Sequence, residues 1–432
     1  MSLLKDSLII SLSRVLISGL MFLGDAVLSR YLGVVGKGEY FYIYNFIFML
    51  SVILTSGLEY GNLFYSRKGS ISQLLYNAWI YFAVVSVLLM IIIPSAIDLI
   101  SEFPVKTHFI KACTVVGIIL EIIFLVSLDL LLAKGNIISY VSVRIMRRIS
   151  FFVMIFAFWL SYHSSELTIS FMCYLSSLFM GLVMLYFFLR SDFNTKLTFQ
   201  KDVFLQTITY GIKTHIGKVT ERFHARSCIF LIGALSSTSD IGLYSVTIGI
   251  SETLLYFSNA ASLAIFSRVK NEPEQQAKDA RTVLRHVLPA AIGLSAVLAF
   301  VGPYIIRIFF GNAFAGAYSA LKLILPGITV YTIYPVVSAY LINIGKSSLA
   351  SGCSIMGLCC NVVLNIVLIP SYGIEGAAIS SSISYTATAL FSLMIFMRYS
   401  RSSMGSALLL SSGDIKKIKN YVAQVAHFTN PR

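Results

Sequence analysis

Charged residues are scarce in this sequence. Only 12% of its 432 residues are Asp, Glu, Lys or Arg, whereas 57% are hydrophobic and the mean hydropathy is +0.82. A soluble protein carries roughly 25% charged residues, because polar side chains must cover the surface that folding leaves exposed. The shortage argues against a soluble enzyme, a disordered chain and a secreted disulfide scaffold. It indicates a protein that crosses a lipid bilayer several times.

Motifs for metal, nucleotide or covalent chemistry are also missing. The six cysteines lie within or beside apolar runs, without a C-x-x-C pair or Cys/His ligand spacing, so we interpret them as buried free thiols. No H-E-x-x-H or Ser/His/Asp arrangement is present, and Gly345-Lys346-Ser347 lacks the earlier glycine of a phosphate loop. The sequence therefore predicts neither an enzyme nor a bound cofactor, and no nucleic-acid partner.

Long apolar windows fill most of the chain. A helix needs about 20 apolar residues to cross a hydrocarbon core of about 30 Å, and twelve windows of roughly that length occur, at 7–29, 40–64, 74–100, 109–132, 139–161, 167–189, 203–234, 241–267, 286–310, 318–344, 348–369 and 374–397. Continuous runs such as Val84–Ile93 lack the alternation of an outer-membrane β-barrel strand. Because the first window is too long for a cleavable signal peptide, all twelve are predicted to be membrane helices of an all-α fold.

The basic residues are distributed unevenly between the two sides of these windows. If the N-terminus is cytoplasmic, 22 of the 33 Lys and Arg residues fall in cytoplasmic segments, 6 in outer segments and five within windows. Lys and Arg accumulate on the cytoplasmic side of membrane proteins. We therefore expect both termini in the cytoplasm and interpret most of the net charge of +14 as a topology signal.

A weak internal repeat divides the chain in two. Gly33 and Tyr40 come just after the first window, and Gly233 and Tyr244 come at and after the end of the seventh, about 200 residues later. Twofold repeats are common in transporters. We predict one six-helix bundle over 1–200, a second over 201–400, and a cytoplasmic amphipathic tail over 401–432 that lies on the membrane surface.

Ionisable residues inside the windows are the candidate functional groups, because an ionisable group at mid-bilayer is costly unless it faces a cavity or a partner. The window 203–234 carries several of them, and Arg14 occupies a comparable place in the first window. Arginine binds phosphate through two parallel hydrogen bonds, so these residues are the predicted cationic wall for an anionic substrate: Arg14, Lys213, His215, Lys218, Arg222 and Arg226. The alternative is a long helix whose cations reach the cytoplasmic interface.

Acidic residues within the windows are candidates for ion coupling. A carboxylate in a poorly solvated site can carry a proton, and the predicted coupling candidates are Asp25, Glu59 and Glu252, for H⁺ or Na⁺. Each has a structural alternative: Asp25 as a partner of Arg30, and the others, like Glu121 and Asp129, as partners of interior arginines. Arg144, Arg147 and Arg148 are interpreted mainly as a topology patch at the interface, with a place in the cavity as the alternative.

The segment Asn361–Ser380, which reads NVVLNIVLIPSYGIEGAAIS, resembles the N-x-x-L-N-x-x-L-I-P-x-x-G-x-x-G-A-A segment of polysaccharide-repeat-unit (O-antigen, Wzx-type) flippases. These belong to the multidrug/oligosaccharidyl-lipid/polysaccharide exporter superfamily. Further matches are Leu325-Pro326, Asn343-Ile-Gly345-Lys346, Arg30-Tyr-Leu32-Gly33 and Ile241–Ser245. We expect Pro370 to end the eleventh helix.

The resemblance implies two six-helix bundles around a V-shaped cavity. It implies a flippase of the bacterial inner membrane that moves a polyprenyl-pyrophosphate-linked oligosaccharide by alternating access and is coupled to an ion gradient. Expected partners are this substrate, membrane lipid, a polysaccharide polymerase and a chain-length regulator. The alternatives are a drug/cation antiporter of the superfamily, which would favour interior acids, a polymerase or ligase with a large outer loop, and a fourteen-helix flippase of peptidoglycan precursors.

Overall fold

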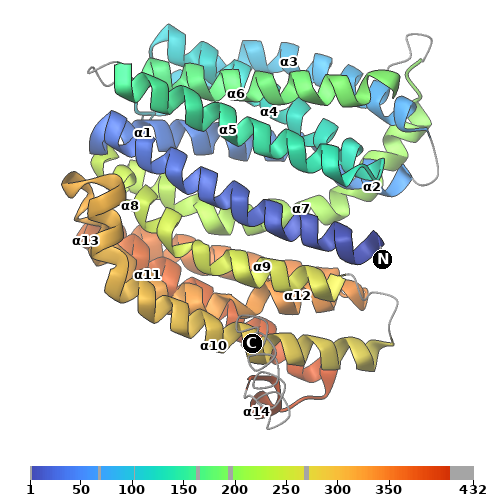
Figure 1. Ribbon diagram of the computed structural model, residues 1–432, viewed down its shortest axis with the longest axis vertical. Helices are drawn as coiled ribbons and strands as arrows, with labels where there is room; N and C mark the ends of the chain where they lie inside the picture. Colours follow the sequence, from blue (N-terminus) through green and yellow to red (C-terminus); the bar gives the residue numbers. More distant parts are fainter. Residues whose placement is uncertain are drawn as a thin grey trace, which may run out of the picture.

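The protein is built of α-helices in this computed structural model, which describes residues 2–66, 70–101, 103–161, 166–192, 198–266 and 272–408 (Figure 1). No β-strand occurs among those residues. The helices are α1 (Ser2–Leu54), α2 (Leu58–Tyr65), α3 (Ile71–Leu99), α4 (His108–Ala133), α5 (Ile137–Ser161), α6 (Leu167–Leu189), α7 (Lys201–Leu235), α8 (Thr238–Ser251), α9 (Thr253–Phe266), α10 (Pro273–Ile305), α11 (Ala317–Tyr331), α12 (Ile333–Asn343), α13 (Ser347–Ser400) and α14 (Met404–Leu408). There are also three short segments of other helix types: the 3-10 helices η1 (Arg190–Asp192) and η3 (Asn312–Phe314), and the π-helix η2 (Ile306–Phe310).

Two of these helices reverse direction at a glycine. α1 has 53 residues and α13 has 54, and a straight helix of that length would extend about 80 Å. Gly33 and Gly373 have φ values of 68° and 52° with ψ values of −176° and −129°, a combination that is essentially restricted to glycine. The chain folds back at both points: Asn361 donates to Ser384 Oγ at 3.1 Å although 23 residues separate them.

Every predicted window coincides with helical structure, so the prediction of an all-α, multi-pass membrane protein is confirmed. Seven helices of the described residues are long and apolar enough to span a membrane. Other windows are charged, as in α5 and α7, or are divided between two consecutive helices, as in α8–α9. The eleventh predicted helix does not end at Pro370, because α13 continues past the proline and reverses only at Gly373.

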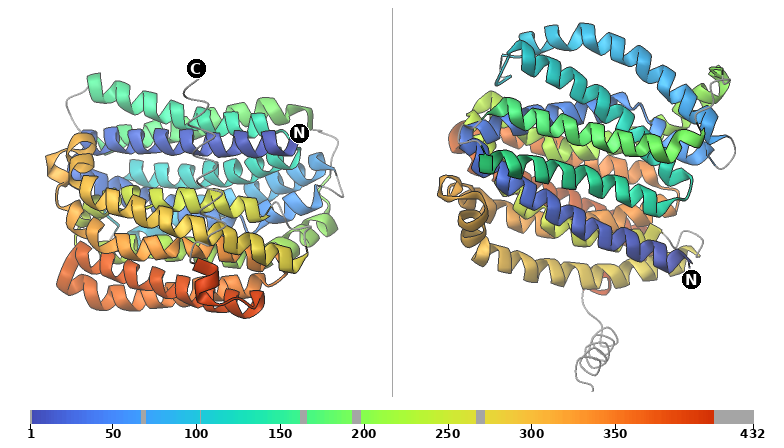
Figure 2. Two further views of the ribbon diagram at one scale, coloured as in Figure 1. Left: turned by 60° about the horizontal axis from the view of Figure 1, so that its bottom comes forward. Right: turned by 45° about the horizontal axis from the view of Figure 1, so that its top comes forward.

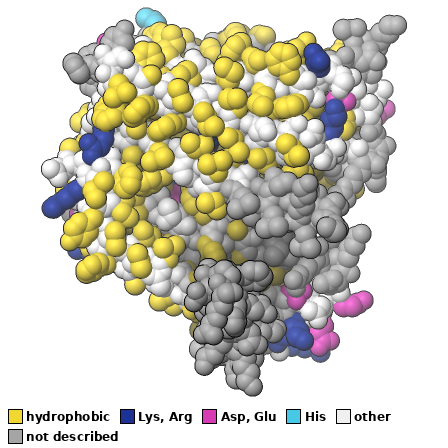
Figure 3. Space-filling view, in the orientation of Figure 1, with side chains coloured by type: hydrophobic (Ala, Val, Ile, Leu, Met, Phe, Trp, Pro, Cys, Tyr) yellow, Lys and Arg dark blue, Asp and Glu magenta, His cyan; other side chains and the backbone are white. Residues whose placement is uncertain are grey.

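Apolar side chains cover the outside of the molecule, as lipid contact requires. On α3 the exposed residues include Val84, Val87, Met90 and Ile91. Figure 3 shows hydrophobic side chains across the visible face, with Lys and Arg gathered toward its margins. The surface that would be unfavourable in water is therefore the surface that a hydrocarbon core would cover.

The helices form two groups joined through α1, α2, α7 and α8. α3–α6 pack together on one side and α9–α13 on the other, as Figures 1 and 2 show. Between the groups, α1 packs on α8 and α2 packs on α7. The tail predicted over 401–432 is described only as far as residue 408; α14 packs against α10, and residues 409–432 lie outside the described part.

Both contacts between the groups depend on glycine. A Cβ at Gly38 would overlap the carbonyl oxygen of Thr238, and one at Gly242 would overlap the carbonyl oxygen of Val34. At the second contact, a Cβ at Gly57 would lie 2.5 Å from the carbonyl carbon of Gly211. Gly38 and Gly57 are 19 residues apart on α1 and its continuation, about 28 Å at the helical rise. The two contacts therefore lie near opposite ends of a bilayer core.

Candidate functional site

A cavity of about 790 Å³ lies between the two glycine contacts. Its walls come from α1, α5, α6, α7, α8, α9 and α10, so both groups of helices contribute. Aromatic residues line part of it, including Phe22, Tyr40, Tyr44 and Phe48 from α1 and Tyr256 from α9. The space is large enough for a small organic group.

Five arginines line this cavity. Arg144, Arg147 and Arg148 come from α5, whereas Arg222 and Arg226 come from α7. Asp25 and Glu252 are the acidic residues of the lining, as far as the structure describes it. Because an unpaired charge in a poorly solvated site is costly, the partners of each arginine decide what the cavity can bind.

Two of the five arginines are neutralised by buried or half-buried acids. Arg147 donates to both carboxylate oxygens of Glu121 at 3.0 and 2.7 Å, and the Tyr174 hydroxyl donates to Glu121 Oε2 at 3.0 Å. Arg226 donates to both carboxylate oxygens of Glu252 at 2.6 and 2.9 Å. These paired geometries satisfy the carboxylates and leave little net charge at either site.

The other three arginines have no ion pair among the described residues. The Arg222 guanidinium lies 5.0 Å from the centre of the Phe48 ring, and that of Arg144 lies 5.4 Å from the Tyr140 ring. Stacking on an aromatic face leaves the hydrogen-bond donors at the edge of a guanidinium available. Arg148 is half-buried in the same wall. Together these three residues give the cavity a positive electrostatic character.

Among the predicted cations whose side chains the structure describes, only Arg222 and Arg226 line the cavity. Lys218 has a side chain that is 41% exposed and pairs with Glu221 at 2.9 Å on its own helix. His215 faces α2, and Arg14 is half-buried outside the lining, within electrostatic range of Arg144. The side chain of Lys213 lies outside the described part of the structure. His215, Lys218 and Arg222 are spaced three and four residues apart, so they lie on the same side of α7. They nevertheless face α2, an exposed surface and the cavity respectively, because α2 covers one end of α7.

The predicted acids all pair with basic side chains. Glu59 pairs with His215 and Glu252 with Arg226. Asp25 pairs with Lys37, which is fully buried, and not with Arg30 as the alternative interpretation expected.

Arg30 caps the end of a different helix. It donates through Nε to the Phe309 carbonyl at 2.8 Å and through Nη2 to the Ile308 carbonyl at 2.6 Å. These bonds satisfy carbonyl groups at the end of η2.

The structure favours the alternative interpretation of the α5 arginines, a place in the cavity, because all three line it. The sequence signal for a place in the cavity was their spacing on one helix, together with an acid, Glu121, in the preceding window. The same pattern fits cations that extend along a helix to the interface. The sequence could not separate the two possibilities, because the Glu121–Arg147 pair depends on how α4 and α5 pack.

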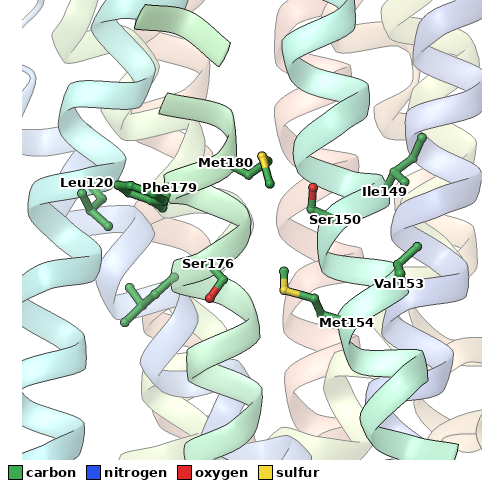
Figure 4. Close-up of a pocket in the computed structure, with 9 residues that line it drawn as sticks. Leu120, Ile149, Ser150, Val153, Met154, Ser176, Phe179 and Met180 are labelled. Carbon is green, nitrogen blue, oxygen red and sulfur yellow. The ribbon is translucent and has the colours of Figure 1, made fainter. Parts of the chain in front are cut away.

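A second pocket of about 620 Å³ is apolar. It lies between α5 and α6, where Ser150 and Met154 face Ser176 and Met180, with Leu120 of α4 nearby (Figure 4). The described residues that line it include no charged side chain. No cluster of three or more metal-ligating side chains occurs among the described residues either. The arginine-lined cavity is therefore the better candidate for recognition of a charged substrate.

Comparison with known proteins identifies relatives of this chain. A profile of the family described as "Polysaccharide biosynthesis protein" matches residues 15–319. A curated protein of Haloferax volcanii, "Probable low-salt glycan biosynthesis flippase Agl15", is 24% identical over 182 residues, which are 41% of this chain and 38% of that protein. The alignment thus spans less than two fifths of the relative's length.

Solved structures share the fold over nearly the whole chain. An inward-facing MATE family multidrug resistance transporter of the MOP superfamily has a TM-score of 0.73 at 13% identity, covering 91% of this chain and 99% of that one. The lipid II flippase MurJ in an inward closed conformation has a TM-score of 0.71 at 15% identity, covering 92% and 90%. At these identities the likeness shows a common fold, and the chain's own cavity has to indicate the substrate.

Proposed function

The chain belongs to the polysaccharide biosynthesis protein family, and on that premise we propose that it is a flippase for a polyprenyl-pyrophosphate-linked oligosaccharide. The substrate would be an O-antigen or similar repeat unit, carried across the bacterial inner membrane. In this proposal the protein is a transporter and not an enzyme. Its further partners would be a polysaccharide polymerase and a chain-length regulator, which use the translocated unit.

The observation that carries the proposal is the set of cavity arginines without acidic partners. A pyrophosphate diester has two negative charges and several acceptor oxygens, and it cannot cross a hydrocarbon core without compensation. Arg144, Arg148 and Arg222 offer delocalised charge and paired donors for such a group. The sugars would occupy the polar and aromatic part of the cavity, whereas the polyprenyl chain would remain in lipid.

Alternating access gives the two glycine contacts a role. We propose that residues 1–200 and 201–400 move as two bundles, and that the α1–α8 and α2–α7 contacts open in turn. The positive-inside distribution supports both termini in the cytoplasm. An H⁺ or Na⁺ gradient would drive the cycle through one of the candidate carboxylates Asp25, Glu59 and Glu252.

A drug/cation antiporter of the same superfamily is the main alternative. Its cargo would require acidic residues free of cationic partners, yet Asp25 and Glu252 in the lining are both paired with basic side chains. A polymerase or ligase is disfavoured for another reason, because the described connections between helices are short and none forms a large outer domain.

The experiment is complementation of a strain that lacks this gene, read out as surface polysaccharide. We expect Arg222→Ala to abolish the surface glycan at normal expression and Arg222→Lys to restore only part of it, because lysine cannot bind phosphate in a paired geometry. Lys218→Ala is the matched control from the same helix and should retain the glycan. Full surface glycan with Arg222→Ala would contradict the proposal.

A further inference from the structure

One histidine–carboxyl pair lies at a glycine contact and not in the cavity. His215 of α7 places Nδ1 3.2 Å from Glu59 Oε1 of α2, and Nε2 3.3 Å from the backbone carbonyl oxygen of Ile53. The side chains of His215 and Glu59 are only 7% and 12% exposed. Glu59 Oε2 is buried without a hydrogen-bond partner among the described residues. The pair is therefore enclosed and poorly solvated.

Hydrogen-bond accounting shows that this arrangement requires a bound proton. A backbone carbonyl only accepts, so Nε2 of His215 must carry hydrogen to bond with Ile53. The remaining bond, between Nδ1 and Glu59 Oε1, then needs one more proton, held either by the imidazole or by the carboxyl group. Without it, the lone pair of Nδ1 would face a carboxylate oxygen at 3.2 Å, and the contact would become repulsive.

The pair lies at the junction between the two groups of helices. Gly57 and Gly211 bring the backbones of α2 and α7 together, and His215 follows Gly211 by one helical turn. Ile53 and Glu59 stand on either side of the break between α1 and α2, where Ser56 and Gly57 have positive φ. His215 thus holds both sides of this break with its two ring nitrogens.

Other ionisable groups face the pair from the neighbouring helices. Asp129 of α4 lies within electrostatic range of Glu59, Arg144 and Arg222. Tyr60, beside Glu59 on α2, lies within range of Glu221 and Arg222 of α7. Lys218 is paired with Glu221 and stands one turn from His215. The cavity arginines and the His215–Glu59 pair therefore share one electrostatic neighbourhood.

We propose that His215 and Glu59 form a proton-binding site that closes the α2–α7 contact. With one proton between Nδ1 and Oε1, the two helices are joined; release of that proton places two acceptors face to face and opens the contact. The inference rests on the proposed transport function for its place in a cycle, in which it identifies the coupled ion as H⁺. The proton-dependent contact itself does not require a bound substrate.

The test is hydrogen–deuterium exchange of the purified full-length protein in lipid nanodiscs, without substrate. Glu59→Gln keeps a donor opposite Nδ1 at every pH, because an amide N–H can bond a neutral imidazole. At alkaline pH, peptides covering residues 53–61 and 207–215 should exchange several-fold faster in the wild type than in Glu59→Gln. At acidic pH the two proteins should exchange equally. Amide exchange depends on pH in any peptide. The wild type and the variant are therefore compared at the same pH, so that this dependence cancels.

Glu221→Gln is the matched control, since it makes the same chemical change on α7 outside the contact. It should behave as the wild type does, and unchanged exchange in the remaining peptides shows that each variant is folded. Equal exchange of wild type and Glu59→Gln at both pH values would overturn the proposal, as would an effect of Glu221→Gln equal to that of Glu59→Gln. Because no substrate is used, this result is independent of whether the protein flips a glycolipid.

Discussion

At the scale of single residues, the partner of each arginine decides its role. Arg147 and Arg222 both reach the cavity, but Arg147 is saturated by Glu121 whereas Arg222 lies against the ring of Phe48. The sequence predicted that the cations of α7 face a wet interior. It could not predict which of them would be neutralised, because Glu121, Glu252 and Glu221 come within reach only through helix packing or a neighbouring turn.

The buried pair of Glu121 and Arg147 should be a structural element of the bundle. Glu121→Gln removes the charge that compensates a 6% exposed arginine, and breaking such a pair costs about 3–5 kcal/mol. We expect a clear fall in the thermal unfolding temperature in detergent. Glu221→Gln is the control, because Glu221 pairs with Lys218 and the two side chains are 36% and 41% exposed, where a pair contributes about 0–1 kcal/mol. Equal shifts for both variants would contradict a structural role.

At the scale of helices, hydropathy and length were sufficient to locate the helical segments, because lipid imposes both constraints on any spanning helix. The reversal points were partly predictable. Gly33 follows the first predicted window closely, whereas the sequence predicts the end of the eleventh helix at Pro370 and the chain reverses at Gly373. The contacts between helices were not predictable, since a glycine at an interface and one facing lipid look the same in a sequence.

The close approach of α1 and α8 gives a prediction at this scale. Gly242→Ala places a methyl group against the Val34 carbonyl, so the helices must separate. We expect weaker packing, a lower unfolding temperature and reduced surface glycan. Gly293→Ala on α10 meets no atom within 4 Å, and alanine is favoured over glycine in a helix by up to about 1 kcal/mol. That control should be neutral or stabilising; equal loss in both variants would show that the contact is unimportant.

At the scale of the whole molecule, the few basic residues have two roles. The sequence assigned most basic residues to topology, at the ends of the apolar windows, whereas a few arginines from α5 and α7 meet at one cavity. The family and the fold were recognisable from the sequence. The composition of the cavity was not, because the α5 arginines fit an interface patch equally well until the packing of α4, α5 and α6 is known.

The central claim is that this cavity recognises a pyrophosphate-linked lipid. The most direct measurement is the flipping rate in proteoliposomes of two fluorescent lipids with the same polyprenyl tail, one with a pyrophosphate-linked sugar and one with an uncharged link. The account predicts rapid flipping of the first lipid only, its loss with Arg222→Ala, and its retention with Lys218→Ala. Equal rates for both lipids, or unchanged flipping with Arg222→Ala, would contradict it.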